Sequence, residues 1–133
     1  MKQFKRGEQQ MKRGLFILAH GSRSPEAGKQ LENVVANIEK NGGAKFQFVE
    51  YGAMELSKPS FPQGIENLAN KGVEEIVIVP LFLFFGNHIK KDIPKILEDI
   101  KVKHPNVKFT LTSPIGEDPR IVDIVIEKGN QAL

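Results

Sequence analysis

The sequence has no cysteine among its 133 residues. Disulfide bonds, thiolate nucleophiles, iron–sulfur clusters and cysteine-ligated zinc are therefore excluded. A chain without disulfide bonds is typical of the cytoplasm, which is the location we expect for this protein.

Long apolar runs and secretion signals are missing as well. The longest apolar run, residues 76–85, has ten positions and includes Pro80, whereas a membrane-spanning helix needs about 20 residues. The N-terminal residues have neither the apolar segment nor the small-residue cleavage site of a secretory signal. We therefore expect no membrane partner.

Common nucleotide and hydrolase motifs are also absent. The sequence has no Gly-x-x-x-x-Gly-Lys-Ser/Thr loop, no Gly-x-Gly-x-x-Gly loop and no Gly-x-Ser-x-Gly elbow. Binding of nucleoside triphosphates or dinucleotides, and serine hydrolysis at such an elbow, therefore lose support.

Positive charge is concentrated at the N-terminus. The net charge is +3, but residues 1–13 alone carry +4, so the rest of the chain carries −1. A basic end on a nearly neutral domain does not favour nucleic acid as a partner. We expect residues 1–12 to be a largely disordered extension and residues 13–133 to form one domain.

Short apolar runs alternate four times with segments of helical periodicity. The sequence predicts strands at about residues 14–19, 46–51, 75–80 and 107–111, and helices at about residues 25–41, 60–70, 89–103 and from 119 onward. This order favours an α/β three-layer sandwich with a four-stranded parallel sheet and right-handed crossovers.

Several helix ends carry recognisable signals. Ser24 and Pro25 are predicted as the cap and first residue of the first helix, and Gly42-Gly43 as its end. Pro94 interrupts the apolar stripe of the third helix, so we expect it in the first turn, with Asp92 near the cap. Asp118-Pro119 predicts the start of the last helix.

Chemically capable side chains follow the predicted strands. In a parallel sheet the strand-end loops share one edge, where ligands of α/β proteins bind. The loops carry His20, Ser22 and Arg23; Glu55, Ser57 and Lys58; Asn87 and His88; and Ser113. Two histidines and a carboxylate that converge there would form a divalent-metal or acid/base site.

Each of these residues also has a purely structural interpretation. His20 could only satisfy hydrogen bonds in its turn, His88 could face solvent at the start of a helix, and Glu55 could be solvated. His104 precedes Pro105 at a helix end, where a surface cation is the favoured interpretation.

The loop after the third strand is unusually apolar. Residues 81–85 read Leu-Phe-Leu-Phe-Phe, and five consecutive apolar side chains cannot all point into the core. Some of them pack beneath the sheet edge, and the others would form an apolar shelf beside the histidines. Such a shelf suits a large, flat aromatic ligand.

The spaced motifs resemble one family. Residues 19–23 (AHGSR), 54–59 (MELSKP), 79–83 (VPLFL) and 86–94 (GNHIKKDIP) are similar to those of the short CbiX-type chelatases. These class II tetrapyrrole chelatases insert cobalt or nickel into sirohydrochlorin. The resemblance covers about residues 14–125.

The resemblance implies a flavodoxin-like, chelatase-like half-domain that acts as a homodimer, whereas longer relatives fuse two halves around the active cleft. It implies that His20 is the proton acceptor and a metal ligand, and that His88 is the second metal ligand. Glu55 is an alternative proton acceptor. The substrate-binding residues it implies are Lys58, Leu83, Phe84, Phe85, Gly86, Asn87 and His88. Relatives can carry an acidic residue at the position of Lys58, and the histidine-rich tail of some relatives is absent.

The implied function is metal insertion in cobalamin or related tetrapyrrole biosynthesis. The metal (Co²⁺, Ni²⁺ or Fe²⁺) is a substrate, and no permanently bound cofactor is expected. Two other interpretations stay open: a metal or tetrapyrrole carrier without catalysis, and a small-anion-binding domain that uses the helix start at Ser24-Pro25.

Overall fold

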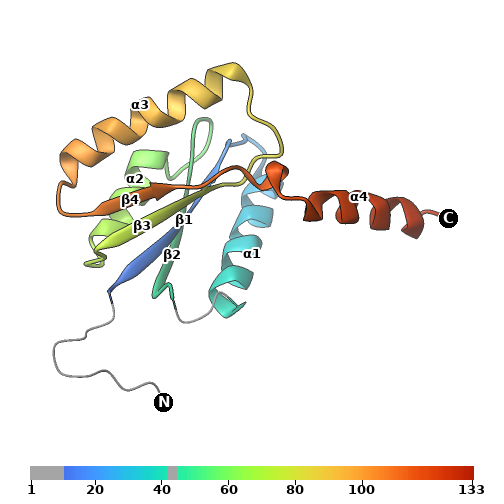
Figure 1. Cartoon of the computed structure of the whole chain (residues 1–133), viewed down its shortest axis with the longest axis horizontal. Coiled ribbons are helices and arrows are strands. Elements are labelled where there is room, and N and C mark those ends of the chain that lie inside the picture. The colour runs from blue at the N-terminus through green and yellow to red at the C-terminus, as the bar shows by residue number, and fades with distance from the viewer. Residues whose placement is uncertain (1–10, 42–44) are drawn as a thin grey trace, which may run out of the picture.

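The computed structural model describes residues 11–41 and 45–133 (Figure 1). Its elements are β1 (Arg13–Ala19), α1 (Pro25–Asn41), β2 (Phe48–Ala53), α2 (Phe61–Ala69), β3 (Glu75–Pro80), α3 (Asn87–Lys103), β4 (Lys108–Leu111), the 3₁₀ turn η1 (Ile115–Glu117) and α4 (Arg120–Gln131). Most of the predicted N-terminal extension, and the predicted helix end at Gly42-Gly43, lie outside the described residues.

The four strands form one parallel sheet in the order β2-β1-β3-β4. Leu18, near the end of β1, is paired with Gly52 of β2 and with Pro80 of β3. The strands therefore end together, and the loops that follow them meet at one edge of the sheet. The predicted α/β fold with a parallel four-stranded sheet is confirmed.

One face of the sheet packs against α2 and α3. Phe16 and Leu18 of β1, with Ile76 and Ile78 of β3, alternate along their strands and enter this core. Each contributes roughly 1.5–3 kcal/mol by burial. The helices supply the buried residues Ile65, Leu68, Ile93, Leu97 and Ile100. Helix α1 lies across the strands from α3 and packs on β2 (Figure 1).

The third helix begins earlier than predicted. Gly86 is its extended N-cap residue and Asn87 its first residue, so the prediction that Pro94 lies in the first turn, with Asp92 near the cap, is wrong. Pro94 lies inside α3 and is exposed. The carbonyl group that loses its amide partner is therefore on the solvent side of the helix, where water satisfies it.

Smaller differences occur at two other elements. Strand β2 is displaced by two residues from its predicted range. Helix α4 begins at Arg120, with Pro119 just before it, and Asp118 Oδ1 accepts a hydrogen bond from the Arg120 amide at 2.9 Å. Pro119 therefore occupies the cap position predicted for Asp118, and Asp118, one residue earlier, satisfies the first free amide of the helix.

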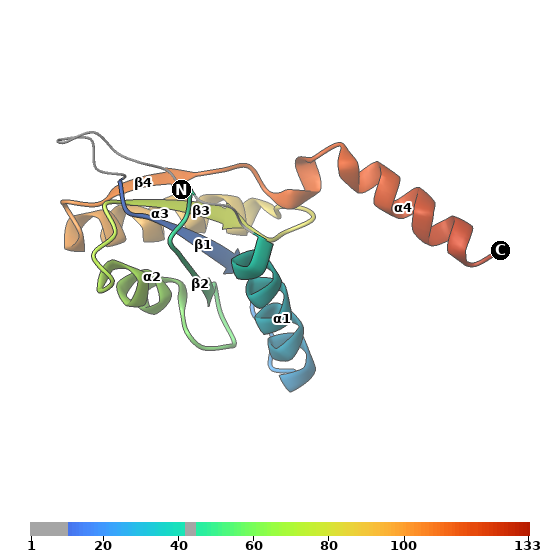
Figure 2. The ribbon, with the colours of Figure 1, turned by 90° about the horizontal axis from the view of Figure 1, so that it is seen from below.

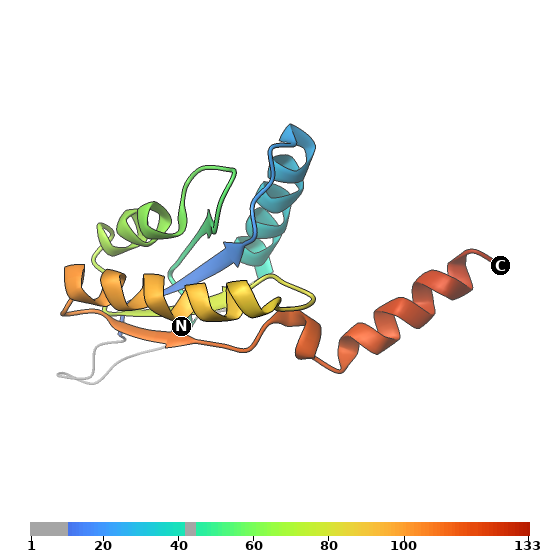
Figure 3. The same ribbon diagram turned by 90° about the horizontal axis from the view of Figure 1, so that it is seen from above.

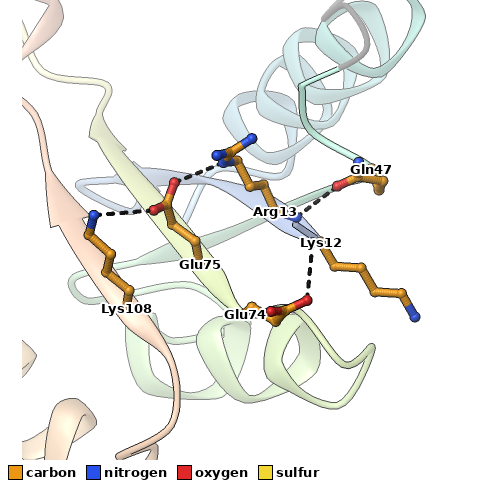
Figure 4. A network of polar contacts seen from close by, with 6 residues as sticks. All are labelled: Lys12, Arg13, Gln47, Glu74, Glu75 and Lys108. Carbon is orange, nitrogen blue, oxygen red and sulfur yellow. Dashed lines mark hydrogen bonds and ion pairs between the residues drawn. The ribbon is translucent and has the colours of Figure 1, made fainter. Parts of the chain in front are cut away.

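Polar groups close the amino end of the sheet, opposite the strand-end loops (Figure 4). Glu75 lies between two cations: Arg13 Nε at 3.0 Å and Lys108 Nζ at 3.6 Å. Gln47 accepts from the Arg13 amide at 2.7 Å. These contacts link β1, β3 and β4 with the residue before β2, so this end of the sheet is structural. Within the described ranges, no helix is both long and apolar enough to cross a membrane.

Candidate active site

His20 and Glu55 come together because β1 and β2 keep pairing beyond their ends. The Met54 amide donates to the Ala19 carbonyl at 2.9 Å, and the Glu55 amide donates to the His20 carbonyl at 3.1 Å. As a result His20 Nε2 lies 3.4 Å from Glu55 Oε1, and both side chains are about half exposed. A histidine and a carboxylate in contact at the edge of the sheet form the centre of the candidate site.

Gly21 makes this approach possible. Its φ of +108° is one that residues with a Cβ rarely adopt, and a Cβ there would lie 1.6 Å from the carbonyl oxygen of Glu55. The Ser22 amide donates to Ser57 Oγ at 3.1 Å. The His-Gly-Ser motif thus holds the first loop directly against the second.

The apolar segment after β3 divides into inward and outward side chains. Phe82 is buried, its ring meets the His20 imidazole edge-on at 6.1 Å, and its centroid is 5.6 Å from that of Phe85. Leu83 and Phe84 point outward, and Phe84 is 85% exposed. Phe82 therefore supports His20 from below, while Leu83 and Phe84 form an exposed apolar surface, which we call the apolar shelf.

The loop after β4, which includes η1, holds this apolar segment in place. The Gly116 amide donates to the Phe82 carbonyl at 2.9 Å, and a Cβ on Gly116 would lie 1.6 Å from the Leu83 carbonyl oxygen. A hollow of about 290 Å³ adjoins the apolar shelf, and its lining includes Leu83, Phe84, Phe85, Asn87 and Lys90. The structure therefore gathers four of the predicted substrate-binding residues around one hollow.

His88 lies in the first turn of α3, and its side chain is 88% exposed. Its Nε2 is 2.9 Å from Asp92 Oδ2, one helical turn further along. From the sequence we predicted Asp92 only as a residue near a helix cap and did not predict its contact with His88. The His-x-x-x-Asp spacing could have indicated this contact, because it places the two side chains on one face of a helix.

The remaining predicted residues lie around this centre without joining it. Lys58 is exposed and lines a separate hollow with Pro59, Ser60 and Gln63. Gly86 precedes α3 as its N-cap residue. Within residues 11–41 and 45–133, no three His, Asp or Glu side chains are close enough to hold one metal ion. His20 with Glu55 and His88 with Asp92 are therefore two separate pairs.

The fold and the site define a class of α/β protein. Its parallel sheet ends in an open edge that combines a histidine–carboxylate pair with an exposed apolar surface. Comparisons with known proteins then identify the family. The CbiX family model matches residues 14–132, so the chain belongs to the CbiX family.

Similar proteins support this membership. The sirohydrochlorin cobaltochelatase of Sulfolobus acidocaldarius is 37% identical over 120 residues, which covers 90% of this chain and 92% of the relative. The crystal structure of a putative cobalamin biosynthesis CbiX protein from Marinobacter aquaeolei has a TM-score of 0.72 and 30% identity, covering 90% of this chain and 98% of the other.

A longer chain with this fold has been solved with a metal. The sirohydrochlorin chelatase SirB from Bacillus subtilis subspecies spizizenii, in complex with cobalt, gives a TM-score of 0.82 at 26% identity. The match covers 91% of this chain but 51% of the SirB chain. The family predicted from the sequence motifs is confirmed.

Proposed function

We propose that this protein is a sirohydrochlorin chelatase that inserts a divalent metal ion, Co²⁺ in the first place, into the tetrapyrrole. One observation carries the proposal: the pair of His20 Nε2 and Glu55 Oε1, 3.4 Å apart, lies at the sheet edge, and His20 also contacts Phe82, next to the apolar shelf. Membership in the CbiX family and the names of its relatives support the same substrate class.

His20 would take a proton during the reaction. Metal insertion replaces two pyrrole N–H protons, and imidazole is the side chain that accepts protons near neutral pH. Both ring nitrogens of His20 face acceptors: Nε2 lies 3.4 Å from the Glu55 carboxylate, and Nδ1 lies 3.4 Å from the Gly21 carbonyl oxygen. The imidazolium that forms when His20 takes a proton can therefore donate on both sides, and Glu55 stabilises its charge. Glu55 is itself the second candidate acceptor.

His88 would present the metal. Asp92 accepts a hydrogen bond from Nε2, which fixes the ring and leaves Nδ1 as the ligand atom. Because His20 and His88 belong to separate pairs, each offers the metal a single imidazole, and the affinity for Co²⁺ or Ni²⁺ rises with ligand number and type. The metal is then held weakly enough to pass to the macrocycle.

The apolar shelf would support the flat face of the tetrapyrrole. Leu83 and Phe84 offer exposed apolar surface, and Asn87 and Lys90 border the hollow beside it. Sirohydrochlorin carries carboxylates around its rim, which Lys90 and the exposed Lys58 and Arg23 could pair with. Phe85 and Gly86 shape the loop that holds these groups.

The open geometry of this edge also favours a homodimer. His20, Glu55 and His88 are all substantially exposed in the single chain. Electrostatic interactions in an active site are stronger when water is excluded from it. A second copy facing this edge would cover the tetrapyrrole.

The test is turnover under anaerobic conditions. Sirohydrochlorin is mixed with excess Co²⁺, Ni²⁺ or Fe²⁺ and a trace of protein, and the absorbance change on insertion is followed. Many equivalents of product per protomer are expected, fastest with Co²⁺, and His88→Ala should be slowed. A change that stops at one equivalent would indicate a carrier, and no change with any metal would refute the proposed function.

A further inference from the structure

Leu56 has a backbone conformation that leucine does not favour. Its φ is +68°, and among the residues that the structure describes it is the only one besides glycine with a positive φ. The Ser57 amide donates to the Glu55 carbonyl at 2.9 Å, so Leu56 is the middle residue of a γ-turn of the rarer, strained form. Glycine or asparagine adopts this conformation at lower cost. The loop therefore keeps a leucine where the backbone alone favours another residue.

The side chain of Leu56 does not stabilise the core. It is 51% exposed, and it is not part of the buried cluster beneath α2 and α3. Leaving a large apolar side chain in water is unfavourable. The backbone strain and the exposure are therefore two costs without a return in folding, and together they indicate that this side chain contacts an apolar ligand.

The backbone on either side of Leu56 is tied to the loop after β1. The Glu55 carbonyl oxygen lies only 1.6 Å from the position that a Cβ on Gly21 would take. On the other side, Ser57 Oγ accepts a hydrogen bond from the Ser22 amide at 3.1 Å. These contacts fix the turn against the loop after β1, and Leu56 is the exposed apolar member of that turn.

Exposed apolar residues gather on the strand-end loops. Outside α4 and the C-terminal residue, the large apolar side chains of the described chain that are more than half exposed are Leu56, Leu83, Phe84 and Val102. Three of these four lie on the loops after β2 and β3. The sheet order is β2-β1-β3, and Figures 2 and 3 show the loop after β2 (green) and the loop after β3 (yellow) on either side of the end of β1 (blue). Leu56 and the apolar shelf therefore lie on opposite sides of His20.

We propose that Leu56 is a further substrate-binding residue, and that its side chain packs on the tetrapyrrole across His20 from the apolar shelf. This inference rests on the proposed function, because the tetrapyrrole is the ligand that Leu56 contacts. The dimensions agree: β2 and β3 are two strand spacings apart, or about 10 Å, which a tetrapyrrole with its rim substituents can span and a single pyrrole cannot. A ring that contacts both sides lies over His20, where its pyrrole protons are removed.

The first experiment replaces Leu56 by asparagine. Asparagine adopts a positive φ more readily than leucine, so Leu56→Asn keeps the turn, removes the apolar side chain and should give a Tm equal to or above that of the wild type. The KM for sirohydrochlorin should rise about tenfold, or about 1.4 kcal/mol, which is no more than the burial of a leucine contributes. The value of kcat should not change, because the contact is equally strong in the ground state and the transition state.

Two further variants serve as controls. Leu56→Met keeps an apolar side chain of similar size and should restore most of the affinity that Leu56→Asn loses. Val102→Asn removes an apolar side chain that is 80% exposed at the C-terminal end of α3, away from the strand-end loops, and should keep the wild-type KM. A wild-type KM in Leu56→Asn would overturn the proposal. It would also be overturned if Leu56→Asn lowered the mass measured by sedimentation equilibrium, because Leu56 would then contact a second copy of the chain.

A double variant tests the arrangement across His20. Contacts that are about 10 Å apart contribute independently. The fold increase in KM for Leu56→Asn combined with Phe84→Ala should therefore equal the product of the two single increases. A double variant no worse than the more affected single variant would place both side chains in one patch, contrary to the proposal.

A titration without metal separates this inference from the proposed function. Sirohydrochlorin alone is added to each protein, and its absorbance change reports binding. If the wild type binds sirohydrochlorin but inserts no metal, and Leu56→Asn weakens this binding about tenfold, the proposed function fails and the role of Leu56 stands. If the wild type inserts metal and both proteins bind sirohydrochlorin with the same Kd, the role of Leu56 fails and the proposed function stands.

Discussion

Two glycine-to-alanine substitutions near the same sheet edge should have opposite effects. Gly21 has φ +108° and lies against the Glu55 carbonyl, where a Cβ would approach to 1.6 Å. Gly28 lies in α1, and a Cβ there meets nothing within 4 Å. The same chemical change therefore tests conformation and contact at one site and helix propensity at the other.

The magnitudes follow from the geometry. An unfavourable positive φ costs about 1–3 kcal/mol, and the clash with Glu55 adds to it, so Gly21→Ala should lower the free energy of unfolding by at least about 2 kcal/mol. For a chain of this size that is a fall in Tm of roughly 6–8 °C. Gly28→Ala should instead gain about 0.5–1 kcal/mol and raise Tm by roughly 2–4 °C.

Thermal unfolding followed by circular dichroism measures both effects, and the rate of metal insertion is measured on the same samples. Gly21→Ala should also lose activity, because the clash separates His20 from Glu55, whereas Gly28→Ala should keep it. Equal Tm values for Gly21→Ala and wild type, together with full activity, would refute the role of Gly21.

Three further predictions address the site and the sheet. Asp92→Asn should raise the KM for the metal about 10–100-fold at unchanged Tm, because His88 loses its orienting carboxylate; an unchanged metal dependence would count against this role. Phe84→Ala should raise the KM for sirohydrochlorin and change the free energy of unfolding by no more than about 0.5 kcal/mol. Phe82→Ala should lower the free energy of unfolding by about 3–5 kcal/mol, because Phe82 is buried. Equal losses of stability would contradict the division into inward and outward side chains. Burial, followed by the charges of Glu32 and Glu50, raises the pKa of Tyr51 above its ordinary value of 10.0. The neutral Tyr51 side chain therefore stabilises the folded protein below pH 10. This stabilisation is lost as the pH rises through the higher pKa that Tyr51 has in the folded protein. Tyr51 is the only tyrosine, so an alkaline absorbance titration that gives a midpoint of 10 in the folded protein would refute this environment.

The part of the site that could be predicted depends on adjacent parallel strands. His20 and Glu55 follow β1 and β2, which are neighbours in the sheet. The prediction that both residues lie at one sheet edge was therefore enough to predict that they lie close together. The position of β3 was predicted to the residue because its β-branched run ends at Pro80. Strand-end position is a strong signal because the sheet itself sets the geometry.

Other features depend on contacts that a sequence pattern does not encode. His88 follows a loop whose path is set by the Gly116–Leu83 contact, so its separation from His20 could not be predicted. Pro94 was placed at a helix start because proline favours that position, yet its exposure inside α3 makes it tolerable there.

The most direct test of the central claim compares two histidines. His104 lies at the C-terminal end of α3, away from the strand-end loops, and serves as the matched control for His20. In anaerobic assays with sirohydrochlorin and Co²⁺, His20→Ala should lower kcat about 100-fold or more, while His104→Ala keeps the wild-type rate. A His20→Ala protein that inserts cobalt as fast as the wild type would contradict the account.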